Sequence, residues 1–214
     1  MLLFQMHRII WHSGGPSEFE EMRQRGGLVY HIKRDIRQEK SAERIMVGAM
    51  HLLLQNPKAP LTIQGICKEC GSSRSTFYRL FDGTDDVIYF WCERFFRGIL
   101  EICAENERTG ISYDPFRLYA EHFSAHTEEL AAILQQGKIG LIMEANRRNL
   151  IEFADVLFPE MDTHSSEFTF FVEMRSSVIV GAWKAWLETG QSASIDEVVE
   201  YSRRQLRYFN REWD

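Results

Sequence analysis

The segment from Ser41 to Phe81 constrains the fold most, because it predicts three helices in close succession. In SAERIMVGAMHLLLQN, apolar residues recur at i, i+4, i+7 and i+8. They mark one face of a helix that Ser41 caps and that Asn56 and Pro57 end. A second helix in LTIQGICKECG begins after its cap, Thr62, and stops at the glycine, and a third follows in SSRSTFYRLF. Two short helices behind a longer one form a helix-turn-helix pattern, whose last helix enters the major groove of DNA.

Polar groups cover most of the third helix. Phe77 and Phe81 are i, i+4 neighbours that anchor it to a small core, and Ser72 or Ser73 caps it. Arginine pairs with guanine or phosphate, and hydroxyl groups donate to phosphate. The segment KRDIRQEK before the first helix is either a basic arm on the DNA backbone or solvated charge, and both interpretations stay open. The residues predicted to contact DNA are Arg37, Lys40, Thr62, Ser72, Ser73, Arg74, Ser75, Thr76, Tyr78 and Arg79.

Charge is distributed unevenly along the chain, which has a formal net charge of −6. Residues 31–80 carry nine Lys or Arg and four Asp or Glu, whereas residues 81–214 carry thirteen basic and twenty-four acidic residues. A basic module joined to an acidic body is typical of a protein with one polyanion-binding end. No apolar run approaches the roughly 18 residues that span a bilayer. Four cysteines without an export signal favour a reducing compartment, so we expect a cytoplasmic protein without a membrane partner.

The remainder of the chain is also predicted to be helical. From Thr84 to about Glu107, apolar residues step by four and three positions, and Asp114 with Pro115 opens the next helix. The inward residues of the first of these helices are expected to be Ile88, Cys92, Phe95, Ile99 and Ile102. Further helices are expected at about 115–125, 127–135, 138–157, 164–188 and 194–210.

The predicted fold class is all-α, with an N-terminal three-helix helix-turn-helix domain and a larger C-terminal helical domain. We place the helix-turn-helix domain at residues 33–83 and the larger domain, for ligand binding and dimerisation, at residues 84–214. Residues 1–32 form an extension that is either disordered or the product of a mis-assigned start codon.

Several motifs resemble the tetracycline-repressor (TetR) family of bacterial transcription regulators. They are R-I-x-x-x-A-x-x-L-L from Arg44 to Leu53, T-I-x-x-I-x-x-x-x-G from Thr62 to Gly71, S-R-S-T-F-Y-x-x-F from Ser73 to Phe81 and D-D-V from Asp85 to Val87. The W-L-x-x-G motif from Trp186 to Gly190 resembles a ligand-domain subgroup common in Gram-positive bacteria.

The resemblance implies an all-helical homodimer that binds a palindromic operator, most often as a repressor, and that a small effector releases. It also implies dimerisation through the last two helices. The interface residues expected on them are Phe171, Arg175, Val178, Ala182, Trp186, Val199 and Leu206. In the family a polar residue is common at the place of Leu80 and a lysine at the place of Thr84, and both hold phosphate. These two departures favour the alternative of a coregulator that acts through a protein partner with little DNA binding.

Aromatic residues of the larger domain are open to two interpretations, an apolar effector pocket or ordinary core. The candidate pocket residues are Trp91, Phe95, Phe116, Tyr119, Phe123, Phe153, Phe170 and Trp183.

Two patterns could bind a metal, but a structural role is favoured for both. Cys67 and Cys70 form C-x-x-C inside a predicted helix, whereas zinc sites place such a pair in a turn. His122 and His126 share a helix face without a clear third ligand, so we expect a solvated face. The sequence contains no Walker loop, H-E-x-x-H or G-x-S-x-G. We therefore expect no enzyme activity, no metal and no cofactor.

Overall fold

The computed structural model describes residues 30–32 and 35–209, with side chains described as far as Gln205. The described chain is all-α, as the sequence predicts, and its only β-type pairing is an isolated bridge between Tyr30 and Phe81. The helices are α2 (Ile36–Gln55), α3 (Ile63–Glu69), α4 (Arg74–Tyr78), α5 (Thr84–Thr109), α6 (Pro115–Ala125), α7 (Thr127–Gln135), α8 (Ile139–Glu152), α9 (Ala154–Leu157), α10 (Ser166–Glu188) and α11 (Ile195–Phe209).

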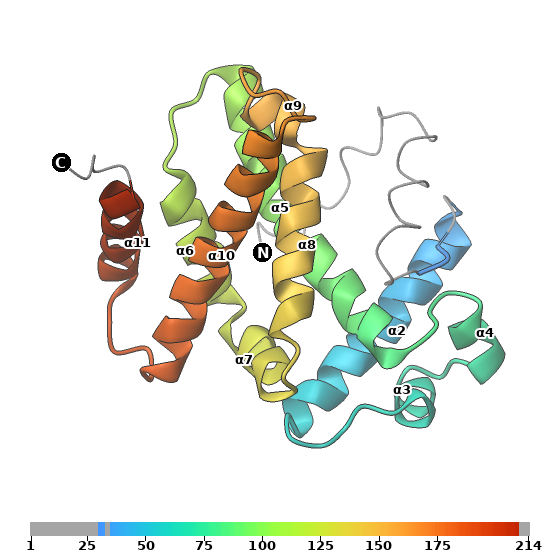
Figure 1. The fold of residues 1–214 in the computed structure, drawn as a ribbon. Helices are drawn as coiled ribbons and strands as arrows, with labels where there is room; N and C mark the ends of the chain where they lie inside the picture. The colour runs from blue at the N-terminus through green and yellow to red at the C-terminus, as the bar shows by residue number, and fades with distance from the viewer. Residues whose placement is uncertain (1–29, 33–34, 210–214) are drawn as a thin grey trace.

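Two groups of helices are visible in Figure 1, and α5 runs from one into the other. Helices α2, α3 and α4 lie together at the lower right, where α2 packs against α3, α5 and α7. In the larger group α5 packs along α8, α8 packs on α10, and α6 packs on α11. The predicted helix-turn-helix and the larger helical body are therefore both present. No helix of the described residues is long and apolar enough to cross a membrane.

The first helix begins earlier than the apolar periodicity indicates. Ser41 lies inside α2 and donates to the backbone carbonyl of Arg37, so its prediction as the cap is wrong. The cap is Asp35, whose carboxylate accepts a hydrogen bond of 2.8 Å from the Arg37 amide. Between the cap and Ser41 the only apolar residue is Ile36, which is exposed, so the segment carries no apolar periodicity. Asn56 ends α2 as predicted.

Helix α4 is only five residues long and depends on its surroundings. Phe77, Leu80 and Phe81 are fully buried against α2, α3 and α5. Tyr30 packs its ring against Phe81, and the His31 amide donates to the Leu80 carbonyl at 2.8 Å. Tyr30, which the sequence assigns to the N-terminal extension, thus forms part of this core. Residues 1–29 of that extension lie outside the described residues.

The larger body departs from the predicted pattern at two places. Ile102 is 38% exposed, and Cys103, four residues after Ile99, is buried in its place, because steps of three and of four both fit the helical period of 3.6 residues. The single helix expected at 138–157 is divided at Phe153 into α8 and α9. Helix α10 ends at Glu188, within the W-L-x-x-G segment, and Gly190 follows with a φ of 68°. The Trp186 indole donates to the Ala193 carbonyl at 2.7 Å.

Phe81→Ala should lower the free energy of unfolding by about 3–5 kcal/mol, because it removes a fully buried ring that touches Tyr30, Phe77 and Phe90. Ile111→Ala serves as the control, since Ile111 is 58% exposed and its loss should cost less than about 0.5 kcal/mol. Urea unfolding followed by circular dichroism measures both. Equal effects of the two substitutions would contradict the packing described for Phe81.

Candidate nucleic-acid interface

The two short helices begin at hydroxyl caps, as predicted. Thr62 Oγ1 accepts from the Gly65 amide at 3.1 Å, and Ser73 Oγ accepts from the Thr76 amide at 3.1 Å. The choice between Ser72 and Ser73 is therefore decided in favour of Ser73. A hydroxyl that accepts from the backbone still carries a hydrogen, so an exposed cap such as Thr62 can also donate to phosphate.

The predicted DNA-contacting side chains mostly face solvent. Tyr78 is 55% exposed, and Thr76 is half-buried. Ser72 is the exception, because its hydroxyl oxygen is buried and has no hydrogen-bond partner among the described residues. The Ser72 hydroxyl therefore does not face solvent with the other predicted side chains. The exposed members of the set are Arg37, Lys40, Thr62, Ser73, Arg74, Ser75, Tyr78 and Arg79.

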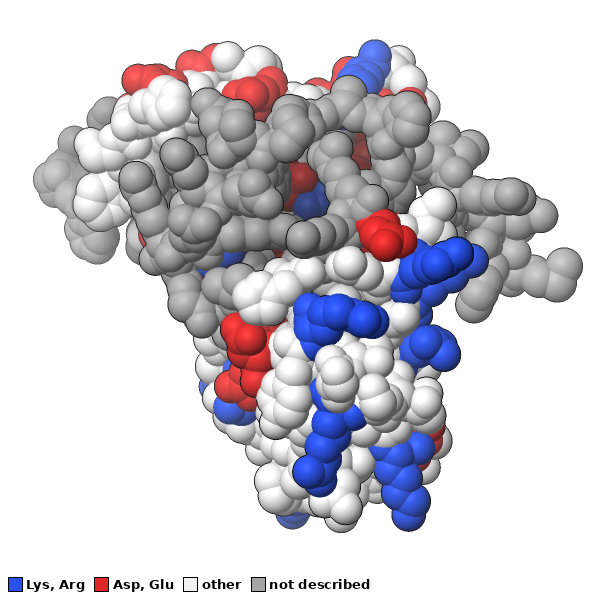
Figure 2. Space-filling model, turned by 90° about the vertical axis from the view of Figure 1, so that its right-hand side faces the viewer, with Lys and Arg blue, Asp and Glu red and all other residues white. Residues whose placement is uncertain are grey.

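Cations on α2, α3 and α4 lack acidic partners. Within the described residues none of them forms an ion pair, although Arg74 donates to the Gln64 side chain at 3.2 Å across α3 and α4. These exposed side chains, which include Lys58 in the α2–α3 loop and Arg79 directly after α4, are Arg37, Lys40, Arg44, Lys58, Lys68, Arg74 and Arg79. In Figure 2, Lys and Arg side chains gather over the lower part of the face that carries these helices.

The body shows the opposite arrangement. Of the Lys and Arg residues from Arg94 to Arg204, every one forms an ion pair with a described carboxylate except Arg175 and Arg204. Cations that are paired inside the protein have less charge to offer a polyanion. The positive charge available to a polyanion is therefore concentrated on α2, α3 and α4.

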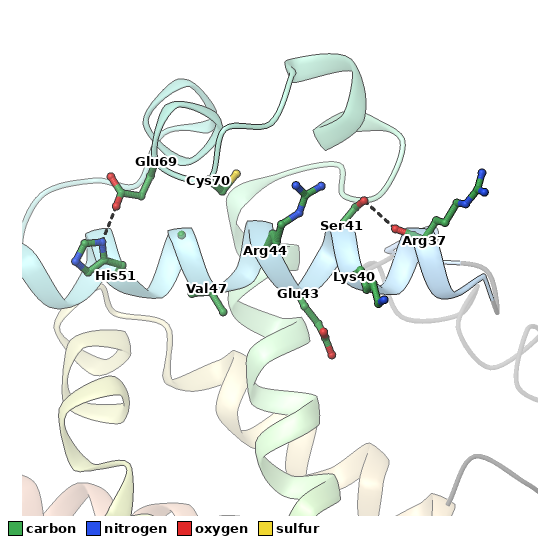
Figure 3. Close-up of a pocket in the computed structure, with 10 residues that line it drawn as sticks. Arg37, Lys40, Ser41, Glu43, Arg44, Val47, His51, Glu69 and Cys70 are labelled. Carbon is green, nitrogen blue, oxygen red and sulfur yellow. Dashed lines mark hydrogen bonds and ion pairs between the residues drawn. The ribbon is translucent and has the colours of Figure 1, made fainter. Parts of the chain in front are cut away.

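A groove of about 880 Å³ runs beside α2, below α3 and α4 (Figure 3). Arg37, Ser41, Arg44 and His51 line its α2 side, and the His51 ring contacts the Glu69 carboxylate at 2.6 Å. Arg44 projects toward α4 in this view and was not among the predicted DNA contacts. Its spacing of seven residues from Arg37 puts both on one helix face, which is a signal that the sequence does contain.

One loop of the body holds the helix-turn-helix in place. The Gln136 side chain donates to the carbonyl of Ala59 at 2.9 Å and also contacts the carbonyl of Pro57, both in the loop between α2 and α3. Two residues later, the Lys138 ammonium contacts Asp85, in the first turn of α5, at 2.7 Å. The loop between α7 and α8 therefore contacts the small domain at the α2–α3 loop and contacts the first turn of α5, which follows that domain.

Five of the aromatic residues predicted for an effector pocket form one continuous cluster in the body. Phe95 stacks on Trp91 at 5.3 Å between ring centroids, and Phe123 contacts Phe95 and Trp183 at 5.0 and 4.9 Å. Tyr119 lies beside Phe123 at 6.3 Å.

The other three candidate pocket residues lie apart from this cluster. Phe116 and Phe153 are half-buried, and the Arg97 guanidinium covers the Phe153 ring at 5.9 Å. Phe170 is 72% exposed on the outer face of α10, so it does not line an interior pocket and its prediction is wrong. The hydrophobic periodicity of α10 is weak because apolar residues occur on nearly all its faces, which hides the outward position of Phe170.

The residues predicted for the dimer interface are divided between surface and core. Trp186 and Val199 are buried within the chain. They therefore do not present the surface to a second subunit that the sequence analysis expects of them. Phe171, Arg175, Val178 and Ala182 are half-buried, and the Leu206 side chain lies outside the described residues. The exposed face of α10 instead presents Phe170, Met174, Ser177, Gly181 and Ala185.

The histidine pair does not lie on a solvated face, which corrects the sequence-based expectation. His122 packs its ring on Phe95 at 4.5 Å, with Nε2 3.1 Å from the Phe95 carbonyl oxygen, and His126 packs on Trp91. Burial, together with the neighbouring His126, lowers the pKa of His122 to about 4. The four cysteines are free thiols, and no group of three His, Cys, Asp or Glu residues in the described chain is placed to hold a metal.

Comparisons with known proteins identify solved structures only, since neither a protein-family model nor a curated protein matches the sequence. A TetR transcriptional regulator from Streptococcus agalactiae 2603V superposes with a TM-score of 0.52 at 17% identity, over 78% of this chain and 93% of that one. The fatty acid degradation regulator FadR from Bacillus halodurans gives a TM-score of 0.51 at 13% identity, over 77% and 96%. The chain shares the fold of these two regulators.

Arg79→Ala should weaken DNA binding roughly tenfold, because it removes an unpaired cation next to α4. The slope of log K against log salt concentration should become shallower by about 1. Arg108→Ala is the matched control, since Arg108 is also exposed but pairs with Glu105 on the body. Fluorescence anisotropy at several salt concentrations measures both quantities. Unchanged affinity and slope in the Arg79 variant would remove it from the interface.

His122 should make stability depend on pH in acid. Because its pKa falls from 6.5 unfolded to about 4 folded, the fold favours the neutral ring, and this stability is lost as the pH falls below about 6.5. Between pH 7.5 and pH 5 the loss should be on the order of 2 kcal/mol. His122→Gln should abolish that component of the urea-unfolding free energy, whereas substitution of the exposed His164 by Gln should retain it. A pH dependence identical in all three proteins would show that His122 is not shielded.

Proposed function

We propose that this protein is a DNA-binding transcription regulator of the TetR type rather than an enzyme. The observation that carries the proposal is the set of exposed, unpaired cations on α2, α3 and α4, beside the hydroxyl-rich surface of α4. Phosphate contacts supply most of the affinity of such proteins, whereas base contacts supply their specificity. Arg74 and Tyr78 are exposed on α4 and are the proposed base-reading or phosphate-contacting side chains. Arg37 and Arg44 on α2 would contact the adjacent backbone.

We further propose that the protein acts as a homodimeric repressor on a palindromic operator. The exposed face of α10 supports a dimer, because an outward Phe170 and Met174 lie at one end of a row of small residues, Ser177, Gly181 and Ala185. Small residues let two helices approach closely, while the apolar side chains at one end would be removed from water. Two α4 helices related by a two-fold axis would bind half-sites about 34–36 Å apart.

A small effector is proposed to release the operator through the loop at Gln136 and Lys138. The aromatic cluster around Phe123 lies in the same body as α7 and α8, which this loop connects. The loop in turn contacts Pro57, Ala59 and Asp85 of the small domain and its boundary. An effector that shifts α7 relative to α8 would change the position of α4 only if these contacts persist.

A coregulator that acts through a protein partner remains the second candidate. Leu80 is fully buried and Thr84 is half-buried at the start of α5, so neither supplies a cation or an exposed polar group next to α4. The acidic body would suit a basic partner protein.

Fluorescence anisotropy with the DNA upstream of the protein's own gene separates the two functions. A regulator should bind this DNA more tightly than a scrambled sequence, and the affinity should fall steeply between 50 and 200 mM salt, as is typical of several phosphate contacts. Equal, weak binding to both DNAs would show that the upstream DNA contains no operator for this protein, and it would favour the coregulator. A pull-down with a protein partner would then be the next experiment.

Gly181→Glu should convert the dimer to a monomer without unfolding it. A side chain at Gly181 would meet no atom within 4 Å in the single chain, so only an α10-to-α10 contact can exclude it. Gly140→Glu is the matched control, because Gly140 lies on α8 with equally open surroundings. Sedimentation at micromolar concentration should give a dimer for the wild type and the Gly140 variant. A monomeric wild type, or a dimeric Gly181 variant, would contradict this interface.

A further inference from the structure

Arg175 is the one half-buried cation in the described body that has no acidic partner. Arg204 is also unpaired, but it is exposed, where an unpaired charge costs little. Arg175 forms no hydrogen bond or ion pair with the described residues, and its Nε atom is shielded from solvent without an acceptor. Burying an arginine without a partner is unfavourable, so its persistence calls for a compensating interaction.

The surroundings of Arg175 compensate only part of this cost. Its guanidinium lies over the rings of Phe158 and Phe171, at 5.4 and 5.7 Å from their centroids. Cation–π contacts stabilise a charge through the ring faces, but they do not supply an acceptor for the shielded Nε–H of Arg175. The two rings themselves touch at 4.8 Å, so an apolar wall stands beside this donor.

The charge of Arg175 also acts on the interior of the body. Burial raises the pKa of Tyr119, and the positive charge of Arg175 opposes that rise. Tyr119 donates to Asn146 at 3.3 Å, and Asn146 donates to the hydroxyl of Ser176, the residue after Arg175, also at 3.3 Å. A row of buried polar groups from α6, α8 and α10 therefore lies near the guanidinium, within an otherwise apolar core.

A second subunit is not the favoured source of the missing anion. The exposed face of α10 follows Phe170, Met174 and Gly181, whereas Arg175 lies on a different side of the helix, against Phe158. A small anion that enters the body could meet Arg175 without a contribution from another chain.

We propose that Arg175 binds the carboxylate of a small organic acid whose apolar body packs against Phe158 and Phe171. This inference rests on the effector of the proposed function and names its chemical class. A carboxylate fits because its two oxygens accept two parallel hydrogen bonds from a guanidinium. The apolar body fits because the rings next to Arg175 offer it an apolar surface. Binding would neutralise the charge of this half-buried guanidinium and give its shielded Nε–H an acceptor.

Isothermal titration calorimetry of the full chain, without DNA, tests this proposal with two carboxylates, decanoate and 2-naphthoate. The uncharged controls are 1-decanol and 2-naphthol. At least one carboxylate should bind the wild type ten times more tightly than its uncharged counterpart, which corresponds to one charge-assisted hydrogen-bonded pair. Arg175→Met should abolish that difference. Lys184→Met, which removes a surface cation from the same helix, should retain it.

The melting temperature of the ligand-free variants separates recognition from a structural role. Arg175→Met should melt no lower than the wild type, because it replaces an unpaired charge with an apolar side chain of similar length. Failure of both carboxylates to bind the wild type, or equal affinity for the Arg175 variant, would overturn the proposal. So would a change in sedimentation without a change in carboxylate affinity, which would assign Arg175 to a subunit contact. The calorimetry contains no DNA, so the measured carboxylate affinity does not depend on whether the protein binds an operator.

Discussion

The burial of Phe77 and Phe81 is the contact on which the surface proposed to bind DNA depends. A helix of five residues is too short to be stable alone, because the entropy lost when the first turn forms exceeds the stabilisation from its few hydrogen bonds. The two rings, with Leu80 between them, hold α4 against the core shared by α2, α3 and α5. Tyr30 completes that core from the N-terminal side. With its inner face fixed, α4 can present almost only polar side chains outward.

Whether its cations form ion pairs distinguishes the small domain from the body more clearly than the net charge of the protein does. A formal charge of −6 argues against a polyanion partner, but most body cations are held by neighbouring carboxylates, whereas those of α2, α3 and α4 are free. The local field at α4 is therefore positive. Arg175 differs from the other body cations in having no carboxylate partner. Because an unpaired cation can bind an anion, we propose phosphate for the exposed cations and a small organic anion for the half-buried Arg175.

Sequence reasoning predicted the all-α class and most helix boundaries because caps and apolar spacing are local signals. Thr62, Ser73, Asp114 and Gly190 act at the helix ends where their residue types predict them. Ser41 was misassigned because the turn before it contains a single apolar residue, Ile36, and so has no apolar periodicity to mark it as helix. The break at Phe153 has no proline or glycine to signal it.

Side-chain environment was harder to predict than helix position, because it depends on neighbours distant in sequence. The inward turn of Ser72, the exposure of Phe170 and the burial of Trp186 and His122 arise from packing between helices. Arg44 could have been found from its seven-residue spacing to Arg37. The isolation of Arg175 could not, since a sequence shows which charges exist but not which of them meet.

Hydroxyl-radical footprinting of the bound upstream DNA tests the central claim most directly. If two α4 helices contact DNA from one dimer, the backbone should be protected in two patches about one helical turn apart, on one face of the duplex. Arg74→Ala should weaken both patches together, because each subunit contributes the same side chain. A single protected patch, or protection that the Arg74 variant leaves unchanged, would contradict the account.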